Sequence, residues 1–203
     1  MLVNERKTNC QITFFNERAL TWDERCHHDM LKVNAILDLL DIQVGDYILD
    51  VGTGTGVLIP ELVKRVTCSG YIKAVDIAEK MIEVAKKKHH WDFVDIQWED
   101  ALINEEYDKY HHIICYSMFP HFKDQELAIN TLAKKLKSGG RLSICHSQSR
   151  HDINTMHQRV HEVVKKDRLP DINTICTYFH YSGLMPLVTI DNQEMYVASG
   201  IKP

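Results

Sequence analysis

Residues 48–56 read Ile-Leu-Asp-Val-Gly-Thr-Gly-Thr-Gly, an apolar run with one acid followed by three alternating glycines. The apolar residues favour a buried strand of a parallel sheet. The glycines permit positive φ and let the backbone approach a ligand closely. An apolar stretch from Val57 can then pack a helix against the sheet. The segment predicts a strand, a glycine loop and a helix, the nucleotide-binding corner of an open α/β sheet.

A second strand is predicted at residues 71–76, Tyr-Ile-Lys-Ala-Val-Asp, and it ends in an acid. Asp76 comes about 20 residues after the last glycine, where the acid of a nucleotide-binding fold accepts hydrogen bonds from ribose hydroxyls. Taken alone, Asp76 would also suit the N-cap of the next helix. Because the glycine loop precedes it, we expect Asp76 to bind a ribose.

The spacing of the glycines separates two classes of cofactor. Dinucleotide-binding loops favour Gly-x-Gly-x-x-Gly, in which the pyrophosphate sits on the helix N-terminus. Here the third glycine comes one residue early, and Val57 occupies the place of the last one. The pattern Asp50-x-Gly52-x-Gly54-x-Gly56 is similar to motif I of the class I methyltransferases, which use S-adenosylmethionine.

Three further segments extend this resemblance over residues 35–203. Asp76-Ile77 looks like the family's ribose acid and the apolar residue that covers adenine. The run 98–101, Trp-Glu-Asp-Ala, looks like its adenine-edge motif, and the run 136–142, Leu-Lys-Ser-Gly-Gly-Arg-Leu, looks like its conserved turn and strand with serine in place of proline. The resemblance implies S-adenosylmethionine as cofactor, with Asp50 orienting its amino group. The implied cofactor-binding residues are Asp50, Gly52, Gly54, Gly56, Asp76, Ile77, Asp100, Ala101 and Tyr116.

Strands and helices alternate along the chain, which predicts a parallel sheet with right-handed crossovers. Residues 187–190 and 195–198 are too close together for a helix to connect them, so they must form a hairpin with one antiparallel strand. Class I methyltransferases end in this way. We therefore predict their Rossmann-like α/β fold, seven strands in the order 3-2-1-4-5-7-6 with helices on both faces. The remaining elements are expected as helices at 29–40, 61–65, 80–88 and 124–137 and strands at 93–98, 110–116 and 141–146.

The composition is that of one globular domain, with 203 residues, 44% hydrophobic residues and a net charge of −4. The negative charge argues against a broad nucleic-acid surface, and no apolar run reaches the ~20 residues that span a bilayer. Six cysteines without a Cys-x-x-Cys pair, and no signal peptide, favour a cytoplasmic setting. We expect a single methyltransferase domain over residues 1–203, a monomer or homodimer that acts on a small molecule without nucleic-acid or membrane partners.

Three of the 12 histidines fall where the carboxyl ends of the strands meet. His121 follows the fourth strand, His146 ends the fifth, and His157 lies on the helix after it. Since ligands bind beyond these strand ends, we expect the three to line the active site, as a general base or as the ligands of a catalytic metal. Arg150 is a further catalytic candidate. His157 and His161, four residues apart, are expected on one face of a helix.

Residues 14–23, Phe-Phe-Asn-Glu-Arg-Ala-Leu-Thr-Trp-Asp, resemble the aromatic-rich N-terminal stretch of small-molecule members of the family, which folds over the cofactor. We expect residues 1–28 to form a comparable lid that excludes water and helps to align the substrate. The alternative is a surface helix held by its aromatic side chains.

These predictions describe methyl transfer to a small-molecule acceptor that the sequence does not name. Residues 117–122 lack the Asn/Asp-Pro-Pro-Tyr/Phe motif of base methyltransferases, which disfavours a flipped base as acceptor. Three alternatives stay open. One is a nicotinamide-dependent oxidoreductase, which the glycine spacing and the hairpin disfavour. The others are a non-catalytic module that binds adenosylmethionine or a metal, and a methyltransferase for protein or RNA, which the acidic balance disfavours.

Overall fold

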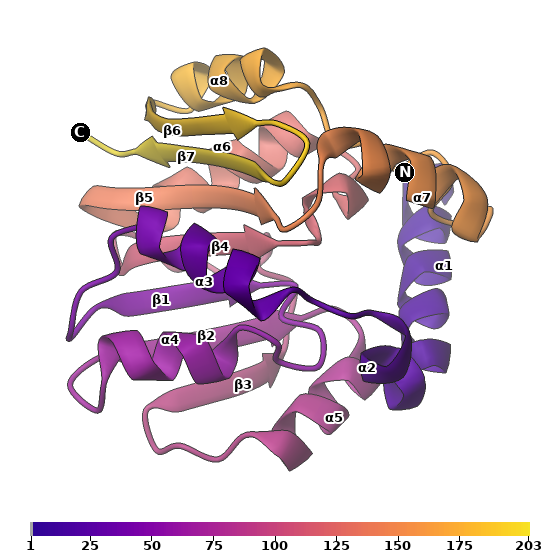
Figure 1. The fold of residues 1–203 in the computed structure, drawn as a ribbon, viewed down its shortest axis with the longest axis horizontal. Helices are drawn as coiled ribbons and strands as arrows, with labels where there is room; N and C mark the ends of the chain where they lie inside the picture. The colour runs from indigo at the N-terminus through magenta and orange to yellow at the C-terminus, as the bar shows by residue number, and fades with distance from the viewer. Residues whose placement is uncertain (1) are drawn as a thin grey trace.

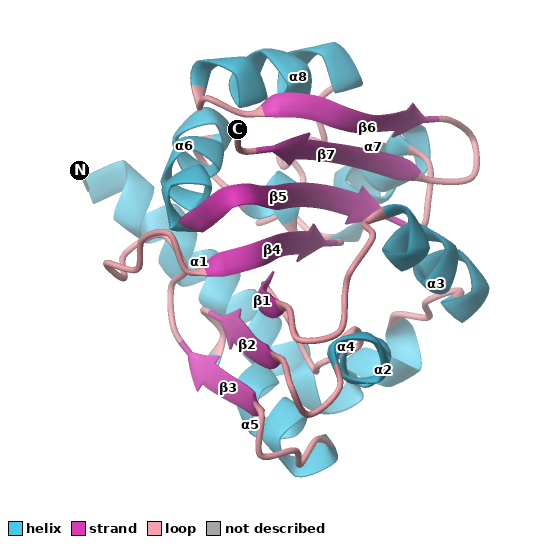
Figure 2. Cartoon of the chain, turned by 90° about the vertical axis from the view of Figure 1, so that its left-hand side faces the viewer, coloured by secondary structure: helices cyan, strands magenta, loops and turns pink. Residues whose placement is uncertain are grey.

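The computed structural model describes residues 2–203, and the side chains of residues 9–203; Met1 of the predicted domain and lid lies outside the described residues. Seven strands form one sheet in the order β3-β2-β1-β4-β5-β7-β6, as Figure 2 shows from edge to edge. Strand β7 is antiparallel to both neighbours, and the other pairs are parallel, which confirms the predicted topology. The strands are β1 (Tyr47–Val51), β2 (Tyr71–Asp76), β3 (Val94–Trp98), β4 (Tyr110–Tyr116), β5 (Leu136–His146), β6 (Met185–Asp191) and β7 (Tyr196–Ile201).

Helices cover both faces of the sheet, because successive strand residues point to opposite sides. Leu49 of β1 lies in one core cluster with Leu132 of α6. Its neighbour Ile48 lies in a second cluster with Ile36 of α3 and Leu62 of α4. The helices are α1 (Leu2–Arg18), η1 (Ala19–Thr21), α2 (Trp22–Arg25), α3 (Met30–Leu39), α4 (Ile59–Val66), α5 (Glu79–Lys88), η2 (Phe119–His121), α6 (Gln125–Lys135), α7 (Arg150–Val160) and α8 (Ile172–Tyr181).

Helix α1 lies beyond the carboxyl ends of the strands, on the same side of the molecule as α7 (Figure 1). The sequence predicted a lid-like segment here, with a surface helix as the alternative, and the structure forms the segment as helix α1 followed by the short helices η1 and α2. Of the helices that the structure describes, none has the length and apolar character needed to cross a membrane.

The start of β5 differs from the prediction. A helix was expected to reach residue 137 and a strand to begin at 141, but α6 ends at Lys135 and β5 begins at Leu136. Gly139 adopts a left-handed φ of 77°, and its N–H donates to the Lys202 carbonyl oxygen over 2.8 Å. The chain therefore leaves the helix early because this glycine turn already pairs with the backbone after β7.

The end of α7 corrects a second expectation. The helix stops at Val160, and His161 has extended backbone angles, φ −166° and ψ 147°. The N–H groups of Val164 and Lys165 then donate to the His161 carbonyl in a separate turn, which buries Val164 to 2% exposure. The prediction that His157 and His161 share one helix face is wrong, because the helix ends one residue before His161.

Candidate active site

The glycine loop leaves β1 in the conformation that its sequence predicts. Gly52, Gly54 and Gly56 have φ values of 68°, 56° and 87°, in the left-handed region. A Cβ at Gly52 would lie 2.6 Å from Met118 Cγ, and one at Gly56 would lie 2.6 Å from the His89 ring. A Cβ at Gly54 would meet nothing within 4 Å. The missing side chains of Gly52 and Gly56 thus leave room for neighbouring protein atoms. Gly54 instead faces open space, in which a ligand can approach the backbone.

Two acids flank this loop from neighbouring strands. Asp76, at the end of β2, accepts from the Gly54 N–H over 2.9 Å and from the Ala78 N–H over 2.8 Å. Burial raises the pKa of this carboxyl, while these two hydrogen bonds oppose the shift. Asp76 therefore holds the glycine loop, at the position expected for a ribose acid. It is not the cap of the next helix, because the N-cap residue of α5 is Ala78.

Asp50 is buried beneath the loop. Its carboxylate accepts from Thr53 Oγ1 over 2.7 Å. Burial raises its pKa to about 7; the Thr53 hydrogen bond lowers it and the nearby Asp76 charge raises it further. A nearby cation would lower this pKa, because it favours the ionised carboxylate. The environment of Asp50 therefore suits the ammonium group that the resemblance assigns to it.

The residues expected at the adenine lie together at the ends of β2 and β3. Trp98 is the register partner of Asp76, and its indole Nε1 donates to the Ile77 carbonyl over 3.0 Å. Asp100 accepts from the Leu102 N–H over 2.9 Å, and Ala101 is buried. This arrangement places an apolar side chain and an acid near Asp76, the residue expected to bind the ribose.

Tyr116 ends β4 on the other side of the loop and is largely buried. Its hydroxyl hydrogen-bonds with Ser147 Oγ over 2.8 Å and with His28 Nδ1 over 3.0 Å. Tyr116 thus connects the expected cofactor site with the N-terminal segment, and this segment also reaches the glycine loop. There Asp23 accepts from Thr55 Oγ1 over 2.5 Å and from Lys88 Nζ over 2.7 Å.

The three predicted histidines are close together. The rings of His121 and His157 are 5.1 Å apart between centroids. His121 donates through Nδ1 to the Asp167 carboxylate over 2.8 Å, and His157 donates through Nδ1 to the Asp167 carbonyl over 3.0 Å. Asp167 is 2% exposed. One residue on the loop before α8 therefore orients two imidazoles.

His146 completes the cluster at the end of β5. It is 1% exposed, and within the described residues neither ring nitrogen has a hydrogen-bond partner. Burial lowers its pKa to about 3, with smaller contributions from His157 and His121. His146 is therefore neutral at physiological pH.

This geometry does not favour the metal hypothesis. Among the side chains of residues 9–203, no group of three or more histidines, cysteines or acids is arranged to hold a metal ion. The Nδ1 atoms of His121 and His157 both donate to Asp167, which leaves Nε2 as the reactive nitrogen of each ring. The contacts therefore suit proton transfer, and no third ligand is arranged with these two rings among the described side chains.

Arg150 lies at the first position of α7 but does not join the histidines. Its Nε donates to Asp191 on the edge strand β6 over 2.7 Å. Side-chain pairing thus draws the guanidinium toward the hairpin.

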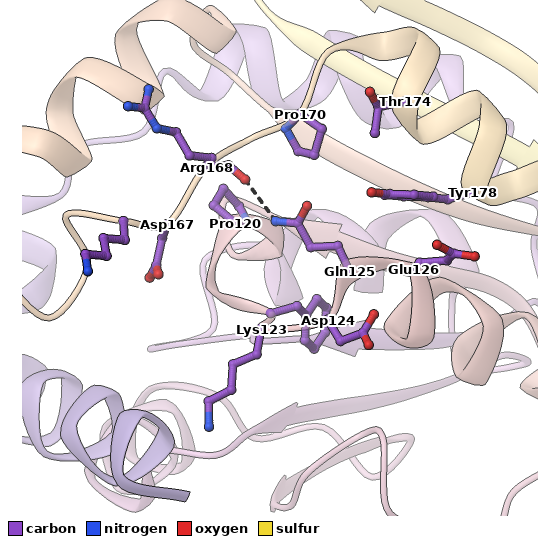
Figure 3. Close-up of a pocket in the computed structure, with 12 residues that line it drawn as sticks. Pro120, Lys123, Asp124, Gln125, Glu126, Asp167, Arg168, Pro170, Thr174 and Tyr178 are labelled. Carbon is purple, nitrogen blue, oxygen red and sulfur yellow. Dashed lines mark hydrogen bonds between the residues drawn. The ribbon is translucent and has the colours of Figure 1, made fainter. Parts of the chain in front are cut away.

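A cavity of about 590 Å³ lies next to the histidines rather than over the glycine loop. Figure 3 shows its lining, in which Asp167 and Arg168 come from the loop before α8, Lys123 from the loop before α6 and Gln125 from the first position of α6. Gln125 Nε2 donates to the Arg168 carbonyl over 2.9 Å, and this hydrogen bond connects α6 with the loop before α8. Asp167 belongs both to the cavity and to the histidine cluster.

Two residues of this site had no signal in the sequence. Asp167 lies in a short polar loop, and Gln11 lies on α1, where its amide donates to Asp167 Oδ2 over 2.9 Å. Neither residue belongs to a sequence motif, and the two residues are 156 positions apart in the sequence. A pattern search within one sequence has no means of finding such a pair.

The chain is similar to known methyltransferases in both sequence and fold. Residues 48–140 match the family model described as "Methyltransferase domain". A SAM-dependent methyltransferase from Aquifex aeolicus has a similar fold, with a TM-score of 0.74 and 15% identity over 93% of this chain and 98% of that chain. Residues 48–140 therefore match a methyltransferase domain in sequence, and the chain has the fold of SAM-dependent methyltransferases, as the resemblance of the sequence predicts.

Named relatives differ in their acceptors. The malonyl-[acyl-carrier protein] O-methyltransferase of Acetivibrio thermocellus is 34% identical over 134 residues, 64% of this chain and 46% of the relative. The ribosomal RNA small subunit methyltransferase A of Mycoplasma capricolum is 27% identical over 143 residues, 63% of this chain and 52% of the relative. The chain spans about half the length of these curated relatives.

Proposed function

We propose that the chain transfers the methyl group of S-adenosylmethionine to a small-molecule acceptor whose nucleophilic atom carries a proton. The observation that carries this proposal is the hydrogen bond from His121 Nδ1 to buried Asp167, beyond the carboxyl ends of the same strands that hold the glycine loop. A carboxylate-oriented imidazole is a common arrangement for a general base.

The residues around the glycine loop fit the cofactor. Gly54 leaves room for a ligand at the backbone, Asp76 offers a carboxylate for the ribose, and Asp50 offers one for the amino group. Ile77 and Ala101 supply apolar contacts for the adenine, with Asp100 at its edge, and Tyr116 closes the other side. The bound cofactor supplies an electrophilic methyl group on a sulfonium.

His121 would then accept the proton of the acceptor. Since Nδ1 carries the hydrogen that is donated to Asp167, Nε2 of the neutral ring holds a lone pair. Proton transfer to Nε2 produces an imidazolium, which the Asp167 carboxylate stabilises. The neutral state of His146 adds no positive charge that would oppose this step. His157 is the second candidate for the base.

The acceptor is proposed to be a small alcohol, phenol or amine, because a carboxylic acid is already ionised at neutral pH and needs no base. The relative from Acetivibrio thermocellus is named for an O-methyl transfer, and a deprotonated oxygen is the product that a histidine base supplies. The net charge of −4 supports this choice over RNA.

Calorimetry with S-adenosylhomocysteine tests the cofactor half of this proposal. We expect binding to the purified chain and no binding of NAD under the same conditions. Binding of NAD alone would favour an oxidoreductase and contradict the proposal.

Release of S-adenosylhomocysteine from S-adenosylmethionine tests the transfer. The acceptors should include alcohols, phenols and amines, with carboxylic acids, a malonyl-carrier protein and RNA as the comparison. Tight cofactor binding without transfer to any acceptor would favour a non-catalytic module. Light scattering of the same sample will report the oligomeric state, expected to be monomer or homodimer.

A further inference from the structure

Gln11 lies on the N-terminal helix α1 and is 3% exposed despite its polar amide. Its Nε2 donates to Asp167 Oδ2 over 2.9 Å, and it lies 3.4 Å from the His121 carbonyl oxygen. The same Asp167 oxygen accepts from His121 Nδ1 over 2.8 Å. An amide, a carboxylate and an imidazole therefore form one chain of hydrogen bonds that begins on α1.

The segment that carries Gln11 also contacts the expected cofactor side. The ring of Phe15, one turn further along α1, packs edge-on against His121 with 5.1 Å between centroids. Asp23 hydrogen-bonds with Thr55 of the glycine loop, and Asn16 accepts from the Lys80 N–H at the start of α5 over 2.9 Å. One continuous segment thus touches both the loop and the base.

A carboxylate that accepts two hydrogen bonds at one oxygen is held more firmly than one that accepts a single bond. If α1 were displaced, Asp167 would lose the Gln11 donor and His121 would lose the Phe15 contact at the same time. Orientation errors of about 1 Å in a catalytic group can cost ~10²-fold in rate. The position of α1 is therefore directly coupled to the orientation of His121.

We infer that Gln11 is a positioning residue, which fixes the Asp167–His121 pair only when the N-terminal helix is docked. This inference rests on the proposed function and deepens it, because it makes a segment outside the sheet part of the machinery that prepares the base. Docking of the segment would assemble the base and cover the cofactor loop in one event.

The first test replaces Gln11 with methionine, which keeps the length and volume of the side chain but has no donor. We expect kcat to fall about tenfold, with the affinity for S-adenosylhomocysteine unchanged within about twofold. Exposed Asn9 on the same helix supplies the matched control, and Asn9→Ala should leave both quantities unchanged. In an Asp167→Asn background, Gln11→Met should have no further effect on kcat, because Gln11 acts through Asp167.

A second measurement does not depend on turnover. Imidazole ¹⁵N chemical shifts of the histidine-labelled protein report the ring tautomer, and His121→Asn identifies the signal of His121. We expect one tautomer, with hydrogen on Nδ1, in the unmodified chain and a mixture in Gln11→Met. An unchanged tautomer and an unchanged kcat in Gln11→Met would overturn the inference, and the proposed function would survive if His121→Asn lost activity. Full activity of His121→Asn would instead contradict the proposed function.

Discussion

The two halves of the site are built in different ways. In the glycine-loop half, residues 47–101, the decisive hydrogen bond joins Gly54 and Asp76 across 22 positions. In the histidine half, residues 116–170, the His121–Asp167 bond spans 46 positions, and its support from Gln11 spans 156. The first half is a local motif, whereas the second is assembled by the tertiary fold. Variants should therefore separate cofactor binding from methyl transfer.

The largest expected effect is on transfer alone. His121→Asn removes the proposed base but keeps a polar ring-sized side chain, so kcat should fall by ~10²-fold or more. Affinity for S-adenosylhomocysteine, measured by calorimetry, should not change. His151→Asn, at an exposed position of α7, is the control and should behave like the unmodified chain. A fall in cofactor affinity for His121→Asn would show that the two halves are not separable.

The converse effect is expected at Asp76. Asp76→Ala removes the carboxylate proposed to bind the ribose, and affinity for S-adenosylhomocysteine should fall by ~10- to 100-fold. Because Asp76 also holds Gly54 and Ala78, circular dichroism must confirm that the variant is folded, and Asp76→Asn offers a milder change. Exposed Glu105 supplies the control, Glu105→Ala. Unchanged affinity in both Asp76 variants would remove the ribose assignment.

A smaller and more selective effect is expected at Gly54. Gly54→Ala places a Cβ in open space at a left-handed φ, so the backbone strain should cost about 1–2 kcal/mol of unfolding free energy. Gly139→Ala imposes the same kind of strain, at a φ of 77° with nothing within 4 Å, far along the chain from the loop. Chemical denaturation should give similar losses for both. Only Gly54→Ala should weaken cofactor binding, and equal affinities would mean that no ligand approaches this backbone.

The smallest effects are opposite responses of stability to pH. The folded-state pKa of His146 is about 3, below its ordinary 6.5, so the unfolded state binds its proton first and stability is lost as the pH falls below about 6.5. The folded-state pKa of Asp50 is about 7, above its ordinary 3.8. The folded state therefore holds this proton more tightly than the unfolded state does, and the stability that Asp50 contributes is lost as the pH rises from about 4 to 7.

Melting temperatures of the unliganded chain between pH 4.5 and 7.5 can distinguish the two groups. His146→Leu should flatten the decline toward acid by a few degrees, and Asp50→Asn should flatten the decline toward neutral pH. His112, whose pKa burial lowers to about 4, adds an acid-side decline that persists in His146→Leu. His151→Leu should leave the profile unchanged. An identical acid-side slope in His146→Leu would contradict a neutral buried His146.

The sequence predicted the parts of this molecule that depend on residues close together along the chain. The β1 strand and its glycines form a local pattern, and the hairpin of β6 and β7 follows from a connection too short for a helix. The meeting of His121, His146 and His157 followed from a topological rule, since parallel strands end at one edge. The end of α7 was missed because no glycine or proline marks Val160 in the sequence. Asp167 and Gln11 were missed because their pairing exists only in three dimensions.

Strand β7 has a consequence for how the molecule acquires its structure during synthesis. It is the last strand in chain order, yet it lies inside the sheet between β5 and β6, and among the described strands β6 pairs with β7 alone. While residues 196–201 are still within the ribosome, β5 retains an open edge and β6 has no strand to join. Completion of the sheet must therefore wait until these residues emerge, and until then the edge of β5 is open to pairing with other chains.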